Sequence, residues 1–312
     1  MHDAEVDLSG VPSPDAVEQW RFYLSGLRNF LETRVAGQSG ALGKIVRAIQ
    51  SAELGFNHSG RGPKGSFLLL GPTGVGKTES AKCFSEYIFG SRAALEMIFM
   101  NEYSSDVRFR EFLERTEASI RRHSSGSTLL FDEVEKAHPK LMDVFLSLLD
   151  EGELTTLSGE RISLARFYIV LTSNLGSGDL ARMENVPYAT MERVALDTAS
   201  QHLRPELFAR VRERIVFKPL TLEVQKRIIQ ELVAEKIEIL SRYFGKTLST
   251  DSGPVSAFLL RVGYSKLQGA RMLRHEVDRQ LNSASLHWAL SSQVPIEGKF
   301  YYDSKIGALV LR

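Results

Sequence analysis

The stretch Gly71-Pro72-Thr73-Gly74-Val75-Gly76-Lys77-Thr78 follows directly after the apolar run of residues 66–70, Ser-Phe-Leu-Leu-Leu. A short apolar run that glycine stops is typical of a buried parallel strand. The eight residues after it match the whole P-loop pattern, in which glycines let backbone N–H groups surround phosphate oxygens where a helix begins. In this pattern the lysine reaches the outer phosphates and the final threonine ligates magnesium. The sequence therefore predicts a strand, a phosphate-binding loop and a helix that bind ATP with Mg²⁺.

Three more short apolar runs predict further strands of the same sheet. They occupy residues 97–100, 128–131 and 167–172, and helical or irregular sequence separates them. Strands that alternate with helices form a parallel sheet covered on both faces, with ligands at the carboxyl ends of the strands. We therefore expect an α/β fold around a parallel sheet.

The segments on either side of this α/β centre have other patterns. Residues 1–12 read as a mobile leader, and helices are predicted over residues 14–34 and 41–54, with a loop over residues 57–65. After Pro219, apolar residues recur at helical spacing. The last strands, 299–302 and 309–311, flank a turn and predict a terminal β-hairpin. We expect a leader and N-terminal helix at 1–34, a large nucleotide-binding domain at 35–218, and a smaller, mostly helical domain at 219–312.

Two carboxylates and one amide follow the predicted strands. Asp132 and Glu133 end the run that begins at Thr128, and Asn174 ends the next run. Adjacent carboxylates at the end of a buried strand are costly unless a cation meets them. Magnesium explains Asp132 as a metal ligand, and Glu133 is suited to act as general base on the attacking water. Asn174 is predicted to hold that water or to sense the γ-phosphate, and the alternative is an ordinary turn residue.

The composition argues against several other classes of protein. Among 312 residues, 43% are hydrophobic and 25% are charged, which is enough apolar material for a full core. The formal net charge of +1 gives no general attraction to nucleic acid or anionic membrane, although a local nucleic-acid site is not excluded. Cys83 is the single cysteine, and no signal peptide or long apolar run is present. We expect a cytoplasmic protein without membrane insertion.

Several segments of the sequence resemble the second ATPase module of the Clp disaggregases. They are residues 65–79, 130–139, 171–177 and 203–210, with Val35-Ala36-Gly37-Gln38 before the P-loop and Gly269-Ala270-Arg271 near the end. The resemblance runs from about residue 30 to the last residue of the sequence. It implies an AAA+ fold, Mg-ATP hydrolysis, and a ring, usually of six subunits, with ATP held between protomers.

The resemblance also implies roles for individual residues. Asn174 would be sensor 1, Arg271 sensor 2, and Arg210 the arginine finger that reaches a neighbouring subunit. A guanidinium supplied in this way suits phosphoryl transfer, which needs charge stabilisation. Val35 and Ala36 would flank the adenine, and Glu79 would complete the nucleotide-binding segment that begins at Gly71.

The sequence departs from the Clp pattern in ways that affect function. We expect one ATPase module, with no amino-terminal substrate domain and no second ring. No aromatic residue lies between glycines in the segment that corresponds to the first pore loop, and the helical spacing of Phe109 and Phe112 favours core packing. Arg212 replaces the usual aspartate, so Arg204, Arg210 and Arg212 all stay open as the residue that acts in trans.

The same segment is rich in arginine. Six basic residues lie there, and three glutamates are interleaved among them: Arg108, Arg110, Arg115, Arg121, Arg122 and His123, with Glu111, Glu114 and Glu117. A solvated helix with internal ion pairs is the favoured interpretation, and a surface for an acidic partner is the alternative. Residues 153–165 resemble the family's second pore loop, which keeps contact with a substrate open.

Three functional hypotheses follow. The leading one is an ATP-hydrolysing, Clp-like protein that remodels or disassembles a specific protein complex without conventional pore-loop threading. One alternative is an ATP-controlled assembly scaffold, for which association with nucleic acid stays open. The other is a conventional protein unfoldase. The tripeptide that docks Clp proteins on their peptidase is missing from the large domain, so we expect no coupling to such a peptidase.

Overall fold

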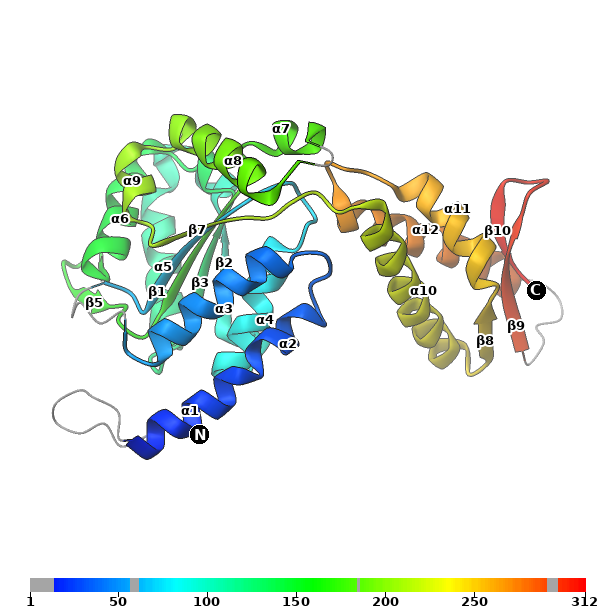
Figure 1. The fold of residues 1–312 in the computed structure, drawn as a ribbon, viewed down its shortest axis with the longest axis horizontal. Coiled ribbons are helices and arrows are strands. Elements are labelled where there is room, and N and C mark those ends of the chain that lie inside the picture. Colours follow the sequence, from blue (N-terminus) through cyan, green and yellow to red (C-terminus); the bar gives the residue numbers. More distant parts are fainter. Residues whose placement is uncertain (1–13, 57–61, 184–185, 291–296) are drawn as a thin grey trace. The chain divides into compact units, whose positions relative to one another are not determined.

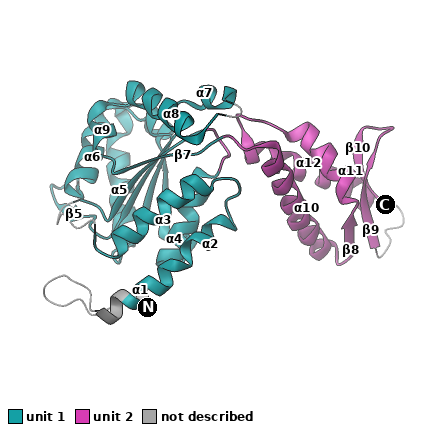
Figure 2. Ribbon diagram, viewed as in Figure 1, with its two compact units in different colours: residues 1–71, 76–218 teal, residues 72–75, 219–312 magenta. Residues whose placement is uncertain are grey.

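The computed structural model describes residues 14–56, 62–183, 186–290 and 297–312. The chain forms two compact units (Figure 2): unit 1 holds residues 1–71 and 76–218, and unit 2 holds residues 72–75 and 219–312. The predicted leader and most of the predicted loop at 57–65 lie outside the described residues.

A parallel sheet forms the centre of unit 1 (Figure 1). Its strand order is β2-β3-β6-β1-β7, and all neighbouring strands run parallel. The strands are β1 Gly65–Leu70, β2 Leu95–Phe99, β3 Thr128–Asp132, β6 Tyr168–Ser173 and β7 Glu213–Val216. The predicted α/β fold with a parallel sheet is confirmed. Because β6 lies between β3 and β1, the residues that follow these three strands are neighbours at one edge of the sheet.

Helices lie on both faces of this sheet (Figure 1). The α-helices are α1 Pro14–Ser25, α2 Leu27–Glu32, α3 Ser39–Glu53, α4 Lys77–Phe89, α5 Phe109–Arg122, α6 Met142–Leu146, α7 Ser177–Arg182, α8 Tyr188–His202 and α9 Pro205–Arg210. Short turns of other helix types are η1 Arg92–Ala94, η2 Met100–Tyr103, η3 Asp106–Arg108, η4 Val134–Lys136, η5 Pro139–Leu141 and the π-helical η6 Ser147–Glu151. A small antiparallel hairpin joins β4 Glu153–Thr155 to β5 Arg161–Ser163.

The core of unit 1 has two layers because strand side chains alternate between the two faces of the sheet. On one face, the Phe67 ring of β1 packs on Phe84 of α4, with centroids 5.8 Å apart. On the other face, the Phe131 ring of β3 packs on Phe145 of α6 at 5.0 Å. All residues of β1 and β6 are buried, as expected for inner strands covered on both sides.

The predicted helix over residues 14–34 is wrong in extent, because the chain forms two helices that are broken at Gly26. The Tyr87 hydroxyl of α4 lies 2.7 Å from the position that a Cβ at residue 26 would occupy, so a side chain there would force Tyr87 to shift. Tyr23 and Tyr87 also exchange hydrogen bonds between their hydroxyls and each other's carbonyls. This contact fixes the junction of α1 and α2 against α4.

Unit 2 is mostly helical and ends in a small sheet. Its elements are α10 Leu222–Phe244, β8 Thr247–Thr250, α11 Ser252–Gly263, α12 Gly269–Ala289, β9 Glu297–Asp303 and β10 Ala308–Leu311. The sheet order is β10-β9-β8, with β9 and β10 antiparallel, so the predicted terminal hairpin is confirmed. Leu273 and Leu281 of α12 are fully buried in a core that α10, α11 and this sheet share.

Candidate active site

The P-loop connects the carboxyl end of β1 to the amino end of α4. Gly71, Gly74 and Gly76 have φ values of 137°, 71° and 107°, which side chains rarely adopt. A Cβ on Gly71 would lie 2.3 Å from the Phe217 carbonyl oxygen, and one on Gly76 would lie 2.6 Å from a Val35 methyl. The backbone therefore forms a cradle at a helix amino terminus, where N–H groups and the helix dipole favour an anion.

Lys77, Asn174 and Glu133 form one hydrogen-bonded series at the same edge of the sheet. The Lys77 ammonium donates to Asn174 Oδ1 at 2.9 Å and also to the Gly71 carbonyl. Asn174 Nδ2 donates to Glu133 Oε1 at 2.8 Å. The strand order accounts for this arrangement. Asn174 follows β6, which lies between β3, the strand before Glu133, and β1, the strand before the P-loop.

Asp132 and Glu133 are joined to β6 through one hydroxyl. Thr172 Oγ1 donates to Asp132 Oδ1 at 2.5 Å and accepts from the Glu133 backbone N–H at 3.1 Å. The Asp132 carboxylate and the Glu133 backbone are thus fixed relative to β6, the strand that Asn174 follows.

The backbone at Glu133 is strained. Its φ is 58°, and among the described residues it is the one residue other than glycine with a positive φ. Such a conformation costs about 1–3 kcal/mol and is concentrated at functional sites. It turns the chain at the end of β3, and the Glu133 carboxylate meets the Asn174 amide.

The segment before α3 lies against the P-loop. Val35 is 4% exposed, and one of its methyl groups is the atom that would lie 2.6 Å from a Cβ on Gly76. Ala36 is partly buried. Gln38 donates to the Lys218 carbonyl at 2.9 Å and accepts from the Lys218 N–H at 3.2 Å, which ties this segment to the chain after β7. Val35 is therefore in place beside the nucleotide-binding segment.

Comparison with known proteins agrees with this geometry. Residues 62–214 match the family described as AAA domain (Cdc48 subfamily). Chaperone protein ClpB of Meiothermus ruber is 34% identical over 312 residues, which cover 95% of this chain and 36% of the relative. ClpB of Pseudomonas putida is 34% identical over 316 residues, covering 97% of this chain and 36% of the relative. The chain contains a Clp-family AAA+ module.

This Clp-family chain corresponds to only part of its relatives. ClpB 1 of a Nostoc species is 33% identical over 291 residues, which cover 88% of this chain and 32% of the relative. The chain thus spans about a third of the length of the relatives it matches. None of the helices in the described ranges is both long and apolar enough to cross a membrane.

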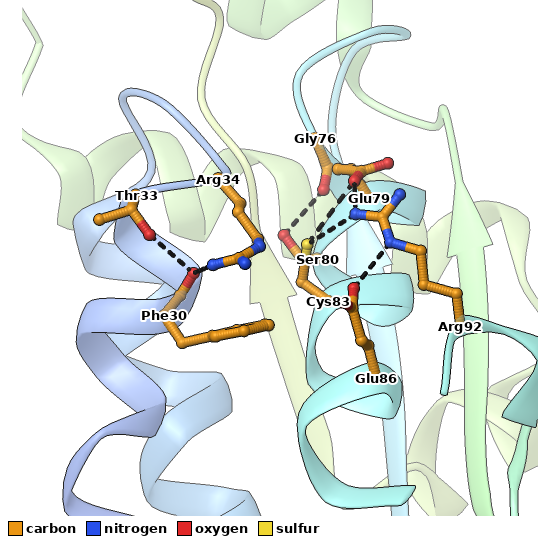
Figure 3. Close-up of polar contacts among 9 residues, drawn as sticks. All are labelled: Phe30, Thr33, Arg34, Gly76, Glu79, Ser80, Cys83, Glu86 and Arg92. Atoms are coloured by element: carbon orange, nitrogen blue, oxygen red, sulfur yellow. Dashed lines mark hydrogen bonds and ion pairs between the residues drawn. The ribbon is translucent and has the colours of Figure 1, made fainter. Parts of the chain in front are cut away.

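Glu79 of the Clp-type ATPase is held by an arginine that the sequence did not single out (Figure 3). Arg92 of η1 donates to the Glu79 carboxylate and to that of Glu86, both at 2.7 Å. On the other side of the P-loop helix, the Arg34 guanidinium stacks on the Phe30 ring, 3.6 Å from its centroid. Glu79 therefore lies in the first turn of α4 with Arg92 as its partner, and its place in nucleotide binding stays a prediction.

Cys83 lies one turn after Glu79 on α4, and its thiol is unreactive. Its side chain is buried, and burial together with the neighbouring Glu79 raises its pKa to about 12. A thiol with this pKa stays protonated at neutral pH, so it is a poor nucleophile. Cys83 thus acts in packing.

Arg210 ends α9 on the surface of unit 1. Its side chain is 53% exposed and pairs with Asp150 of η6 at 2.9 Å. A surface ion pair of this kind contributes about 0–1 kcal/mol and exchanges partners readily. Arg210 can therefore leave Asp150 for a stronger anion without disturbing the fold.

The other arginines near Arg210 are placed differently. The Arg214 guanidinium stacks on Phe208, 4.9 Å from the ring centroid, and donates to the Phe208 carbonyl. The Arg212 N–H donates to the Ser66 hydroxyl at 3.0 Å. Arg212 and Arg214 line a depression of about 440 Å³ beside β7. Arg204 precedes α9 and is exposed.

Arg271 lies in the first turn of α12, in unit 2. It is exposed, and the N–H of the preceding Ala270 donates to the Gly74 carbonyl at 2.9 Å. A Cβ on Gly74 would lie 2.2 Å from the Gln268 carbonyl oxygen. Within unit 2, the start of α12 therefore packs closely on residues 72–75.

The segment that corresponds to the first pore loop is ordered and ion-paired. Arg108 pairs with Glu111, Arg110 with Glu114, Arg121 with Glu117 and Glu160, and Arg122 with Glu96. These pairs support the interpretation as a solvated helix. Before the helix, Lys140 pairs with Asp106 at 2.8 Å, and the next residue, Val107, is 87% exposed. The exposed apolar side chain of this turn is thus a valine.

Phe112 is a core residue, as predicted, and Phe109 is partly buried. The Phe112 ring has its centroid 5.3 Å from that of Tyr103 and 5.9 Å from that of Phe145.

Phe112→Ala should lower the free energy of unfolding by about 3–5 kcal/mol, because it leaves a cavity in this aromatic cluster. Denaturant unfolding measures the loss, and ATPase activity per folded molecule should change little. Phe109→Ala is the control, with a smaller expected loss; equal losses would contradict the core assignment.

Proposed function

We propose that this chain hydrolyses ATP at the Lys77, Asn174 and Glu133 cluster and uses the energy to remodel or disassemble a specific protein complex. The hydrogen-bonded series from Lys77 to Glu133 carries the proposal. It joins a phosphate-binding lysine, a polar amide and a carboxylate at the edge of the sheet where ligands bind in α/β folds.

Each residue then has a role in phosphoryl transfer. Backbone N–H groups of residues 73–76 hold the phosphates, and Lys77 neutralises the outer ones. Glu133 orients the attacking water and takes its proton, while Asn174 fixes that carboxylate. Arg210 stabilises charge in the site of a neighbouring copy, and Arg271 has the role of sensor 2.

Thr78 and Asp132 fit a magnesium ion that arrives with the nucleotide. No group of three or more His, Cys, Asp and Glu side chains in the described part of the chain could hold a metal by itself. Magnesium usually takes one or two carboxylates and completes its shell with phosphate oxygens and water. A threonine hydroxyl together with one carboxylate would match that need. When bound, the ion neutralises charge on the phosphates during transfer.

The remodelling part of the proposal rests on the segment before α5. A grip on many different peptides needs a large, adaptable apolar side chain, which aromatic residues supply. Here the exposed apolar residue of the turn is Val107, while Phe112 is buried. The likeness to ClpB chaperones supports a proposal that the chain acts on a protein client as part of an oligomeric ring.

A trapped variant tests this function. Glu133→Gln, loaded with ATP, should retain a client complex, and wild-type protein with ATP should separate the isolated complex into its components. Lys77→Ala should do neither. ATP turnover stimulated by DNA or RNA, or ATP-dependent filaments without any change in the client, would favour the scaffold hypothesis instead.

A further inference from the structure

Asn174 is held by its backbone as well as by its side chain. Its N–H donates to Glu135 Oε1 at 3.1 Å, and its carbonyl accepts from the Ser177 hydroxyl. The side chain meanwhile bridges Lys77 and Glu133. Backbone contacts on both sides of one residue restrict the direction in which its side chain can point.

Glu135 has one oxygen without a hydrogen-bond partner. It lies in η4, the short turn that begins directly after Glu133. Its Oε1 holds the Asn174 N–H, whereas Oε2 is buried and has no partner among the described residues. A buried carboxylate oxygen of this kind destabilises a fold and calls for an explanation. This cost to folding points to a functional reason for glutamate here.

We propose that Glu135 is the positioning residue that aligns Asn174 between Lys77 and Glu133. Glu133 and Glu135 lie two positions apart on one turn, and they hold the side-chain amide and the backbone N–H of the same asparagine. Two hydrogen bonds therefore connect Asn174 to the turn at Glu133 and Glu135. The inference rests on the proposed role of this cluster in ATP hydrolysis.

Substitutions at Glu135 separate positioning from folding. Glu135→Leu keeps the volume and removes both oxygens, so kcat should fall by roughly 10- to 100-fold, because small misplacements of reacting groups have effects of this size. Affinity for ATP and the thermal midpoint should stay close to wild type. Glu135→Gln keeps an acceptor for the Asn174 N–H and should retain most of the turnover. The matched control is Glu114→Leu, which removes an exposed carboxylate of α5 and should leave kcat unchanged.

A double-mutant cycle tests whether Glu135 acts through Asn174. Asn174→Ala alone should lower kcat, and adding Glu135→Leu to it should lower kcat little further. If the kcat losses of the two single variants multiply fully in the double variant, the inference is overturned. It is also overturned if the loss of kcat in Glu135→Leu matches a loss of folded protein. If Asn174→Ala leaves kcat at the wild-type value, the proposed function of the cluster itself fails. If Asn174→Ala lowers kcat but Glu135→Leu does not, only the role of Glu135 fails.

Discussion

Glu133→Gln should bind ATP about as well as the wild type and lose turnover by roughly 10²- to 10⁴-fold, the usual effect of removing a positioned base. Glutamine keeps the size of the side chain and can still accept the hydrogen bond from Asn174 Nδ2, which is 2.8 Å from Glu133 Oε1 in the native protein. It cannot take a proton from water. The geometry of the site is thereby kept while the chemistry is removed.

Two measurements check this expectation. Equilibrium binding of a fluorescent ATP analogue reports affinity, and phosphate release reports turnover. Lys77→Ala is the contrasting variant, because it removes the ammonium from the phosphate site and should abolish binding. Glu114→Gln on the exposed face of α5 is the matched control and should behave as wild type. Normal hydrolysis by Glu133→Gln would show that another group is the base.

Arg210→Ala should keep nucleotide affinity and lose turnover by roughly 10³-fold or more, as arginine fingers do in other NTPases. The expectation follows from its position: the guanidinium is exposed and paired with Asp150 alone among the contacts seen for its side chain in the described residues. Loss of that surface pair should leave stability almost unchanged. The effect on turnover should therefore come from the neighbouring copy's site.

Mixing experiments test whether Arg210 acts in trans. Added to wild type, Arg210→Ala should inhibit more than dilution explains. Mixed with Glu133→Gln, it should regain some activity, because one copy then supplies Glu133 and its neighbour supplies Arg210. Arg212→Ala and Arg214→Ala are the comparison variants, since both residues lie by the depression beside β7. Activity that simply follows the wild-type fraction, or a larger loss in Arg212→Ala, would contradict the assignment.

The sequence predicted the centre of the fold because its signals are local there. An apolar run before a complete P-loop defines β1 and the start of α4, and the two carboxylates after β3 mark the same edge. Asn174 could be placed beside them since parallel strands bring their carboxyl ends together. The burial of Phe112 followed from helical spacing.

The sequence could not predict features that depend on distant contacts. Strand β7 begins with Glu213 and Arg214, so it lacks the apolar pattern of an inner strand. Gly26, at the break between α1 and α2, packs against Tyr87, which is 61 positions away in the chain. The role proposed for Glu135 has only a weak local signal, its place two residues after Glu133. Its meeting with Asn174 is visible only in the folded chain.

ATP hydrolysis in this chain is expected to drive remodelling without an aromatic side chain that holds a threaded polypeptide. The most direct measurement is ATP-driven unfolding of a stable fluorescent protein with an unstructured tail, followed by loss of fluorescence while ATP turnover is recorded. The fluorescent protein should stay folded through sustained ATP turnover. Robust unfolding that Phe109→Ala abolishes, with stability and ATPase activity intact, would contradict this expectation.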